Sequence, residues 1–283
     1  MFQGVKNIGI VGNGFVGASI ISGFSLTHNI KIYDVDPRRS TSTLEEVVQG
    51  SEFIFVSVPT PMKLSDSGKI DLSIINSVFE EISKIQFDKK EKIFILKSTI
   101  VPGSTRVISE RFPNFNLVFN PEFLTERSAK LDFINSARII LGGKPKNTSK
   151  VEEMYRDRFP HKKIFKISWE EAEFIKYMCN CFFAVKVSFM NEMYQASDSL
   201  GLDWQSIMAS FVADGRIGNS HLQVPGHDGS LGFGGKCFPK DMNAMINFMK
   251  SQQIDPLVLE AAWKKNLQVR KNKDWEKIDG ATS

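Results

Sequence analysis

A glycine-rich segment near the beginning of the chain restricts the possible folds most strongly. The sequence Gly12-Asn13-Gly14-Phe15-Val16-Gly17 follows a short apolar strand pattern, Asn7–Val11, and precedes a helical pattern over residues 18–25. A strand, the spacing Gly-x-Gly-x-x-Gly and a helix in this order are typical of a parallel α/β sheet that holds a dinucleotide. The alternative is a glycine-rich turn in an unrelated α/β fold.

The three glycines of this segment and the residues between the last two each have a physical role in holding a dinucleotide. Gly12 allows the tight turn, Gly14 lets a diphosphate approach the backbone, and Gly17 lets the helix pack closely against the strand. Free N–H groups at the start of the helix, among them those of Phe15 and Val16, favour an anion. We therefore expect these five residues to contact a cofactor.

An acidic residue follows the second strand pattern. That pattern covers residues 30–33 and ends directly before Asp34. A carboxylate at this point can accept hydrogen bonds from both ribose hydroxyls and would repel a 2′-phosphate, which predicts NAD rather than NADP. Arg38 and Arg39 follow closely and weaken this preference, and Arg39 is itself a candidate cofactor contact.

The next part of the chain alternates strand and helix patterns, as a doubly wound sheet does. The expected elements are strands at 53–58, 93–96 and 117–120, a helix at 74–85, and a last strand at 137–142 with an exit loop at 143–147. Thr60 and Thr99 each follow a strand, at the carboxyl end where a nicotinamide would lie. Ordinary turn chemistry explains the two threonines equally well.

Two carboxylates follow the strand pattern at 117–120. Pro121 suits the first position of a helical turn, so Glu122 and Glu126, four residues apart, would lie on one side of it. If they face the ligand crevice, they could act as acid and base. A solvated face is the simpler explanation of the same spacing.

A long helix is expected from residue 170 to about residue 200, because no Pro or Gly interrupts this stretch. We expect it to form a spine between domains and a dimer contact. Lys176, Asn180 and Asn191 fall on nearly the same face of this helix. The Lys could stabilise a developing oxyanion and the amide could orient it, while plain solvent exposure remains the alternative.

A further group of candidate residues surrounds a cysteine in Phe233-Gly234-Gly235-Lys236-Cys237-Phe238-Pro239-Lys240-Asp241. The two glycines would let backbone N–H groups meet a sugar or a diphosphate. Cys237, at the start of a helical turn, would have a lowered thiol pKa. Lys240 adds positive charge nearby, and Asp241 opens the next helix. An inert thiol is the alternative, which the spacing alone does not exclude.

Composition narrows the class of protein further. The 283 residues, 42% of them hydrophobic, suffice for one or two globular domains. A net charge of +4 spread along the chain argues against nucleic-acid binding and is compatible with a phosphorylated substrate. No pattern of a signal peptide or membrane span is found, so we expect a cytoplasmic protein. Cys179, Cys181 and Cys237 lack disulfide or metal spacing, which predicts a reducing compartment and no metal site.

Linked motifs along the chain resemble the UDP-glucose/GDP-mannose dehydrogenase family. They are, in family order, the glycine-rich segment, Lys97-Ser98-Thr99 with Pro102-Gly103, Asn120-Pro121-Glu122-Phe123-Leu124 with Glu126, Lys176 with Asn180, Asn191-Glu192, Arg216-Ile217-Gly218-Asn219, and the cysteine stretch. The resemblance implies an NAD-dependent oxidoreductase that oxidises the C6 alcohol of a nucleotide sugar twice, with UDP-glucose to UDP-glucuronate as the first choice.

The resemblance also implies a role for each candidate residue. Cys237 would hold the half-oxidised sugar as a thiohemiacetal and then as a thioester. Lys176 with Asn180 would stabilise the oxyanion, Asp241 with Thr99 would position a water, and Glu122 would act as base in thioester hydrolysis. The implied substrate contacts are Phe123, Leu124, Glu126, Lys176, Asn180, Arg216, Phe233 and Gly234. The implied cofactor contacts add Thr60, Thr99, Glu126 and Lys240 to those of the glycine-rich segment, Asp34 and Arg39.

The implied architecture is α/β, with a Rossmann-type doubly wound sheet in residues 1–167 and an all-helical central domain in residues 168–283. The central domain would carry the cysteine loop and form a homodimer, with Arg216 reaching the substrate across the interface. Family chains continue into a second Rossmann-like domain, so we expect a form that lacks it. GDP-mannose as substrate and a catalytically silent dinucleotide-binding dimer remain alternatives; the presence of Cys237, Lys176 and Asp241 argues against the silent form.

Overall fold

The computed structural model describes residues 6–63, 69–88 and 91–278. The chain forms two compact units. The first unit comprises Met1–Thr60 and Leu72–Lys176, and the second comprises Pro61–Asp71 and Tyr177–Ser283. The division therefore falls inside the long helix rather than after residue 167, because its first turns pack on the sheet: Trp169 and Ala172 belong to the core of the first unit.

The first unit is built on a seven-stranded sheet with the strand order β2-β1-β3-β6-β7-β8-β9. Its strands are β1 (Asn7–Val11), β2 (Asn29–Tyr33), β3 (Phe53–Val56), β6 (Ile93–Leu96), β7 (Asn116–Phe119), β8 (Arg138–Gly143) and β9 (Lys163–Ile167). Neighbouring strands are parallel, except that β8 runs antiparallel to β7. Every residue of β3 and β6 is buried, as expected where helices cover both faces of a sheet.

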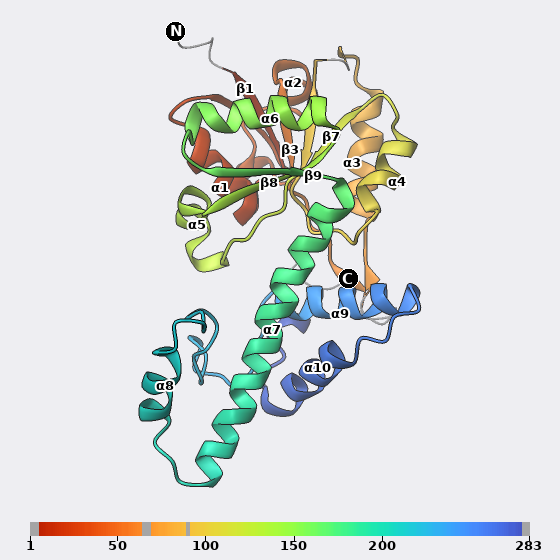
Figure 1. Cartoon of the computed structure of the whole chain (residues 1–283). Helices are drawn as coiled ribbons and strands as arrows, with labels where there is room; N and C mark the ends of the chain where they lie inside the picture. Colours follow the sequence, from red (N-terminus) through yellow and green to blue (C-terminus); the bar gives the residue numbers. More distant parts are fainter. Residues whose placement is uncertain (1–5, 64–68, 89–90, 279–283) are drawn as a thin grey trace. The chain divides into compact units, whose positions relative to one another are not determined.

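Helices pack on both faces of this sheet (Figure 1). One core joins the sheet to α2 (Leu44–Gly50), α3 (Ser73–Lys84) and α4 (Ser104–Arg111). The other joins it to α1 (Phe15–Phe24), α5 (Ala129–Asn135) and α6 (Pro145–Arg158). Aromatic rings fill both cores, for example Phe94 with Phe115 on one side and Phe24 with Tyr155 on the other. The predicted doubly wound α/β fold is confirmed.

Three local expectations for the first unit are wrong. The strand β8 is not the last of the sheet, because β9 pairs with it at the edge. The predicted exit loop at 143–147 contains the start of α6, which Pro145 opens at its first position. Pro121 does not open a helical turn: the chain has no regular structure from residue 120 to residue 125, and only the short helix η3 (Glu126–Ser128) follows.

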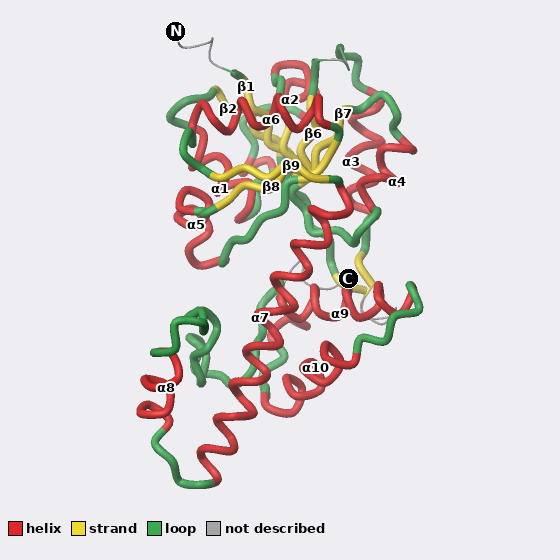
Figure 2. Tube along the Cα trace, viewed as in Figure 1, coloured by secondary structure: helices red, strands yellow, loops and turns green. Residues whose placement is uncertain are grey.

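The second unit is mainly helical. It contains most of α7 (Trp169–Ser199), then α8 (Trp204–Val212), α9 (Phe238–Ser251), α10 (Leu257–Val269) and the short η4 (Asp274–Glu276). It also contains a hairpin of β4 (Met62–Lys63) and β5 (Lys69–Ile70), which lies beside α9 (Figure 2). Within residues 168–278 every regular element is a helix, as predicted, and the hairpin of the second unit comes from Pro61–Asp71.

The predicted long helix is confirmed as α7, which runs for 31 residues. Helix α10 ends at Val269, and the chain then turns so that Arg270 Nε donates to Asn272 O at 2.9 Å. Among the helices that the structure describes, none combines the length and the apolar character that a membrane span needs.

Candidate active site

The glycine-rich turn between β1 and α1 has room for an anion. Gly12 has φ +92°, and a Cβ on it would lie 2.6 Å from Ser57 O. A Cβ on Gly17 would lie 2.2 Å from Gly12 O, so the helix can pack this closely on the turn only if residue 17 is glycine. A Cβ on Gly14 would meet nothing within 4 Å. The open space at Gly14, at the start of α1, fits the diphosphate of a dinucleotide.

Asp34 lies against this turn. Asn13 N donates to Asp34 Oδ2 at 2.6 Å, and Asp36 N donates to Asp34 Oδ1 at 2.9 Å. Arg39 is also close, because Asn13 Nδ2 donates to Arg39 O at 2.8 Å, but its guanidinium pairs with Asp36 at 3.6 Å. The acidic residue after β2 is therefore held where a ribose next to the diphosphate would lie.

The loops after β1, β3 and β6 meet at one edge of the sheet. Ser57 Oγ donates to Gly12 O at 2.8 Å, and Thr60 Oγ1 donates to Thr99 O at 2.8 Å. The order of strands changes direction between β1 and β3, and ligands of open parallel sheets bind outside the carboxyl ends of the strands at such a point. Thr60 and Thr99 are thus brought together beside the glycine-rich turn.

Glu122 and Lys176 form a buried ion pair in the first unit. Lys176 Nζ lies 2.7 Å from Glu122 Oε1, and the two side chains are 3% and 5% exposed. Glu122 Oε2 accepts the N–H of Leu124 at 2.8 Å, and Lys176 Nζ lies 5.7 Å from the ring centre of Phe123. The expectation that Glu122 and Glu126 share one side of a helical turn is wrong, since Glu126 is exposed in η3.

The second unit holds the other group of predicted residues. Asp241 is 1% exposed, and its two carboxylate oxygens accept from Asn180 Nδ2 and Lys240 Nζ, each at 2.6 Å. Cys237 is half-buried and forms the N-cap of α9, one turn before Asp241. Lys240, proposed above as a cofactor contact, is therefore bound to the neighbouring carboxylate.

The remaining predicted residues of the second unit have different surroundings. Asn191 Oδ1 accepts the N–H of Gly232 at 3.0 Å, so this amide of α7 binds the backbone shortly before Cys237. Phe233 is buried, whereas Arg216 is exposed and pairs with Asp214 at 2.6 Å. Burial raises the pKa of the Cys181 thiol, which suits a role in packing.

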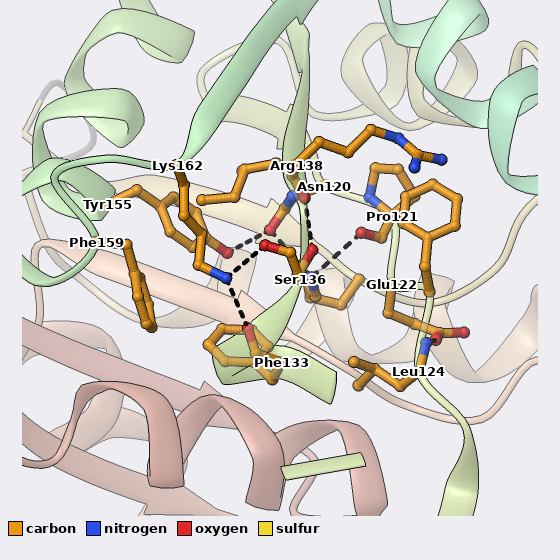
Figure 3. A pocket seen from close by; sticks show the side chains of 13 residues that line it. Asn120, Pro121, Glu122, Leu124, Phe133, Ser136, Arg138, Tyr155, Phe159 and Lys162 are labelled. Atoms are coloured by element: carbon orange, nitrogen blue, oxygen red, sulfur yellow. Dashed lines mark hydrogen bonds between the residues drawn. The ribbon is translucent and has the colours of Figure 1, made fainter. Parts of the chain in front are cut away.

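Two buried charged residues were missed as site residues. Lys97 donates to Asn120 Oδ1 at 3.1 Å and to Pro121 O at 3.4 Å, and lines a cavity of about 30 Å³ that Figure 3 shows from close by. Burial lowers the pKa of Lys97 to about 7, although Glu122 opposes this shift. Such a cavity holds about one water molecule. The signal in the sequence is a lysine that directly follows an apolar strand.

Glu173 is the second buried charge. Its oxygens accept from Gly103 N at 2.6 Å, from Thr105 N at 2.8 Å and from Thr105 Oγ1 at 2.5 Å. Burial raises its pKa to about 7, although these donors act in the opposite direction. In the described ranges, no group of three or more His, Cys, Asp or Glu residues is arranged to hold a metal ion.

Comparison with known proteins gives the same domains in the same order. Residues 37–158 match the model of the UDP-glucose/GDP-mannose dehydrogenase family NAD binding domain, and residues 170–268 match the model of its central domain. The sheet domain is therefore an NAD-binding domain, and the glycine-rich turn and Asp34 fit that cofactor.

Individual relatives agree with these matches. UDP-glucose 6-dehydrogenases of Rickettsia bellii and Rickettsia conorii are 31% and 30% identical, over 92% and 93% of this chain but 66% and 67% of their own lengths. A solved UDP-glucose dehydrogenase from Pyrobaculum islandicum superposes with a TM-score of 0.82 at 26% identity, covering 94% of this chain and 69% of that one.

A more distant structure shares only the fold. The 3-hydroxyisobutyrate dehydrogenase of Mycobacterium tuberculosis has a TM-score of 0.73 at 15% identity, over 93% of both chains. The chain spans about two thirds of the length of the curated relatives that it matches. Both domain models match in order and together cover most of the sequence, so the chain belongs to the UDP-glucose/GDP-mannose dehydrogenase family.

Proposed function

We propose that this chain carries out the NAD-dependent two-step oxidation of the C6 alcohol of a nucleotide sugar, UDP-glucose to UDP-glucuronate. One observation carries the proposal. Asp241, one turn after the half-buried Cys237, is fully buried and keeps both oxygens bound to Asn180 and Lys240. A structural thiol would not require an ionisable group to be buried and positioned beside it.

NAD held at the glycine-rich turn and Asp34 would supply the hydride acceptor, with a fresh molecule for each of the two oxidations at C6. Between them, the sulfur of Cys237 adds to the aldehyde carbon: a carbon–sulfur bond forms, the π bond of the carbonyl breaks, and the thiol proton passes to the carbonyl oxygen. The second hydride leaves this thiohemiacetal and a thioester results. Water then cleaves the carbon–sulfur bond, releases the carboxylate and restores the thiol. The covalent bond retains the half-oxidised sugar between the two steps.

The other predicted residues act on protons and developing charge in this proposal. Lys176 places a cation where the oxygen at C6 becomes negative. Asn180 donates to Asp241 at 2.6 Å and orients its carboxylate, which positions a water for proton transfer. Glu122, paired with Lys176 at 2.7 Å, accepts a proton from the water that attacks the thioester.

The test is the amount of NADH formed on mixing the chain with NAD and a limiting amount of UDP-glucose. We expect two NADH per sugar in the wild type. Cys237→Ser should stop after a single hydride transfer, because serine forms no thioester, and the matched control Cys179→Ser should keep the full yield. Steady turnover by Cys237→Ser would exclude the thioester route.

The choice of sugar is part of the same experiment. GDP-mannose, tested in parallel, is the second candidate, because the Cys237 segment is common to both branches of the family that the sequence resembles. If no nucleotide sugar yields NADH while NAD still binds, the chain is a catalytically silent NAD-binding protein and the proposal is wrong.

We further propose that the chain forms a homodimer in the cytoplasm through α7. Met178, Phe182, Phe189 and Met193 follow one face of this helix and are 52%, 59%, 53% and 38% exposed. An apolar row of this kind is typical of a surface that another chain covers. None of the three cysteines is in a disulfide, which suits a reducing compartment.

A further inference from the structure

Three backbone N–H groups in the turn before Cys237 donate to side chains from three separate segments. We call residues 232–235 the cysteine turn. The three pairs are Gly232 N with Asn191 Oδ1 of α7 (3.0 Å), Phe233 N with Asn266 Oδ1 of α10 (2.7 Å), and Gly235 N with Asp274 Oδ2 of η4 (3.1 Å). The backbone of the turn therefore relies on distant side chains for its hydrogen bonds, and the N–H of Gly235 is already used.

Aromatic packing joins the same segments. The ring of Phe233 lies 6.0 Å from that of Trp263 in α10, and Trp263 lies 5.6 Å from Trp275 in η4. Trp275 is 3% exposed, so the segment after α10 is anchored beside the cysteine turn.

The guanidinium of Arg270 lies directly against this turn. Its Nη2 is 2.8 Å from Asp228 Oδ2 and 3.2 Å from Asp274 Oδ2, and the side chain is 2% exposed. A Cβ on Gly234 would lie 2.4 Å from Arg270 Nη2 and 2.2 Å from Asp274 Oδ1. Only glycine therefore fits at this position while the arginine remains in place.

We propose that Arg270 is a positioning residue that holds Cys237 in its working place by fixing the cysteine turn. The inference rests on the proposed role of Cys237 as the nucleophile. Arg270 orients Asp274, whose Oδ2 accepts the N–H of Gly235, two residues before Cys237. Asp228 ties the loop of residues 224–231 to the same guanidinium.

The chemistry explains why an arginine is needed. A buried guanidinium can satisfy two carboxylates and a carbonyl at once, because its N–H donors point in several fixed directions in one plane. Removing it would leave two carboxylates facing each other without a cation. The turn would then shift, and a displacement of about 1 Å at a nucleophile costs on the order of 100-fold in rate.

The experiment compares the wild type with Arg270→Met, Arg270→Lys and the control Lys250→Met. Lys250 is in the last turn of α9, the helix that Cys237 caps, and its ion pair with Glu260 is on the surface, so the control removes one cation without touching the turn. Hydrogen–deuterium exchange of peptides covering residues 232–237 reports the turn directly, and steady-state kinetics report kcat and KM separately.

For Arg270→Met we expect exchange in the cysteine turn to rise by about tenfold or more, with the sheet domain unchanged. We expect kcat to fall about 10- to 100-fold with the KM for NAD unchanged. Arg270→Lys should show smaller changes in exchange and in kcat than Arg270→Met, because lysine keeps the positive charge but lacks the planar set of N–H donors of a guanidinium. The proposal is wrong if Arg270→Met folds and leaves exchange in the turn at the wild-type rate.

If Arg270→Met does not fold, Asp274→Asn makes the test instead. This variant keeps an oxygen for Gly235 N–H but removes the charge that pairs with Arg270, and it should also raise exchange in the turn. Unchanged exchange in Asp274→Asn would overturn the proposal. Because exchange needs no substrate, a chain that oxidises no sugar would refute the proposed function while the role of Arg270 could still be measured.

Discussion

At the scale of single residues, the carboxylate of Glu173 in α7 binds the first turn of α4. Two N–H groups at the start of α4 and the hydroxyl of Thr105 donate to its carboxylate, which favours the charged form. Burial favours the neutral form and has the larger effect, so the pKa rises from 4.5 to about 7. The folded state therefore holds this proton at a pH at which the unfolded chain has lost it.

This shift predicts a pH dependence of stability. The contribution of Glu173 to the free energy of unfolding is largest below about pH 4.5 and is lost as the pH rises to about 7. Glu173→Gln has no group that titrates at this position. As the pH rises from about 4.5 to about 7, the wild type should therefore lose stability relative to the variant. Urea unfolding at several pH values measures it. Glu153→Gln, at an exposed residue of α6, is the control. A constant difference between wild type and Glu173→Gln across the window would contradict the assignment.

At the scale of elements, two glycines of the turn between β1 and α1 serve different purposes: Gly17 allows close packing, and Gly14 leaves the backbone accessible to a ligand. Gly17→Ala would place a Cβ 2.2 Å from Gly12 O, a backbone atom that cannot move aside, whereas Gly14→Ala meets open space. Both substitutions are the same chemical change three residues apart. Their effects should differ because one glycine serves packing and the other serves access to the backbone.

We expect Gly17→Ala to lower stability by about 1–3 kcal/mol, as overpacking does. Gly14→Ala should cost at most about 1 kcal/mol, through a weaker helix N-cap, yet weaken NAD binding at least tenfold because its methyl group would occupy the space for the diphosphate. Thermal unfolding and calorimetric titration with NAD measure the two effects. Wild-type NAD affinity in Gly14→Ala would show that the diphosphate does not lie at this glycine.

At the scale of the whole molecule, the apolar row on α7 predicts the oligomeric state. Phe182→Glu would bury a charge in the proposed interface and should convert a dimer to a monomer, measured by light scattering during size-exclusion chromatography. Leu26→Glu, at a residue of the sheet domain that is 81% exposed, is the matched control and should remain dimeric. A wild type that is monomeric at all concentrations tested would contradict the interface.

The sequence predicted those helices and strands that are recognisable from their own residues alone. The strand β1, the strand β6 and the long α7 were found nearly to the residue, because apolar periodicity and the absence of Gly or Pro are local properties. The edge strand β9 was missed because it is short and two of its five residues are lysines, and in the structure none of its residues is fully buried. Its strand conformation can be recognised only from its pairing with β8 in the folded sheet.

The sequence by itself determined the doubly wound sheet, the glycine-rich turn for NAD, and the residue types of the candidate site. Only the tertiary structure decided which of these residues meet: Glu122 with Lys176, Asp241 with Asn180 and Lys240, and Arg270 with the cysteine turn. The physical reason is that periodicity reports which face of an element is buried, whereas the partner of a buried charge is chosen by chain segments that come together only when the core packs.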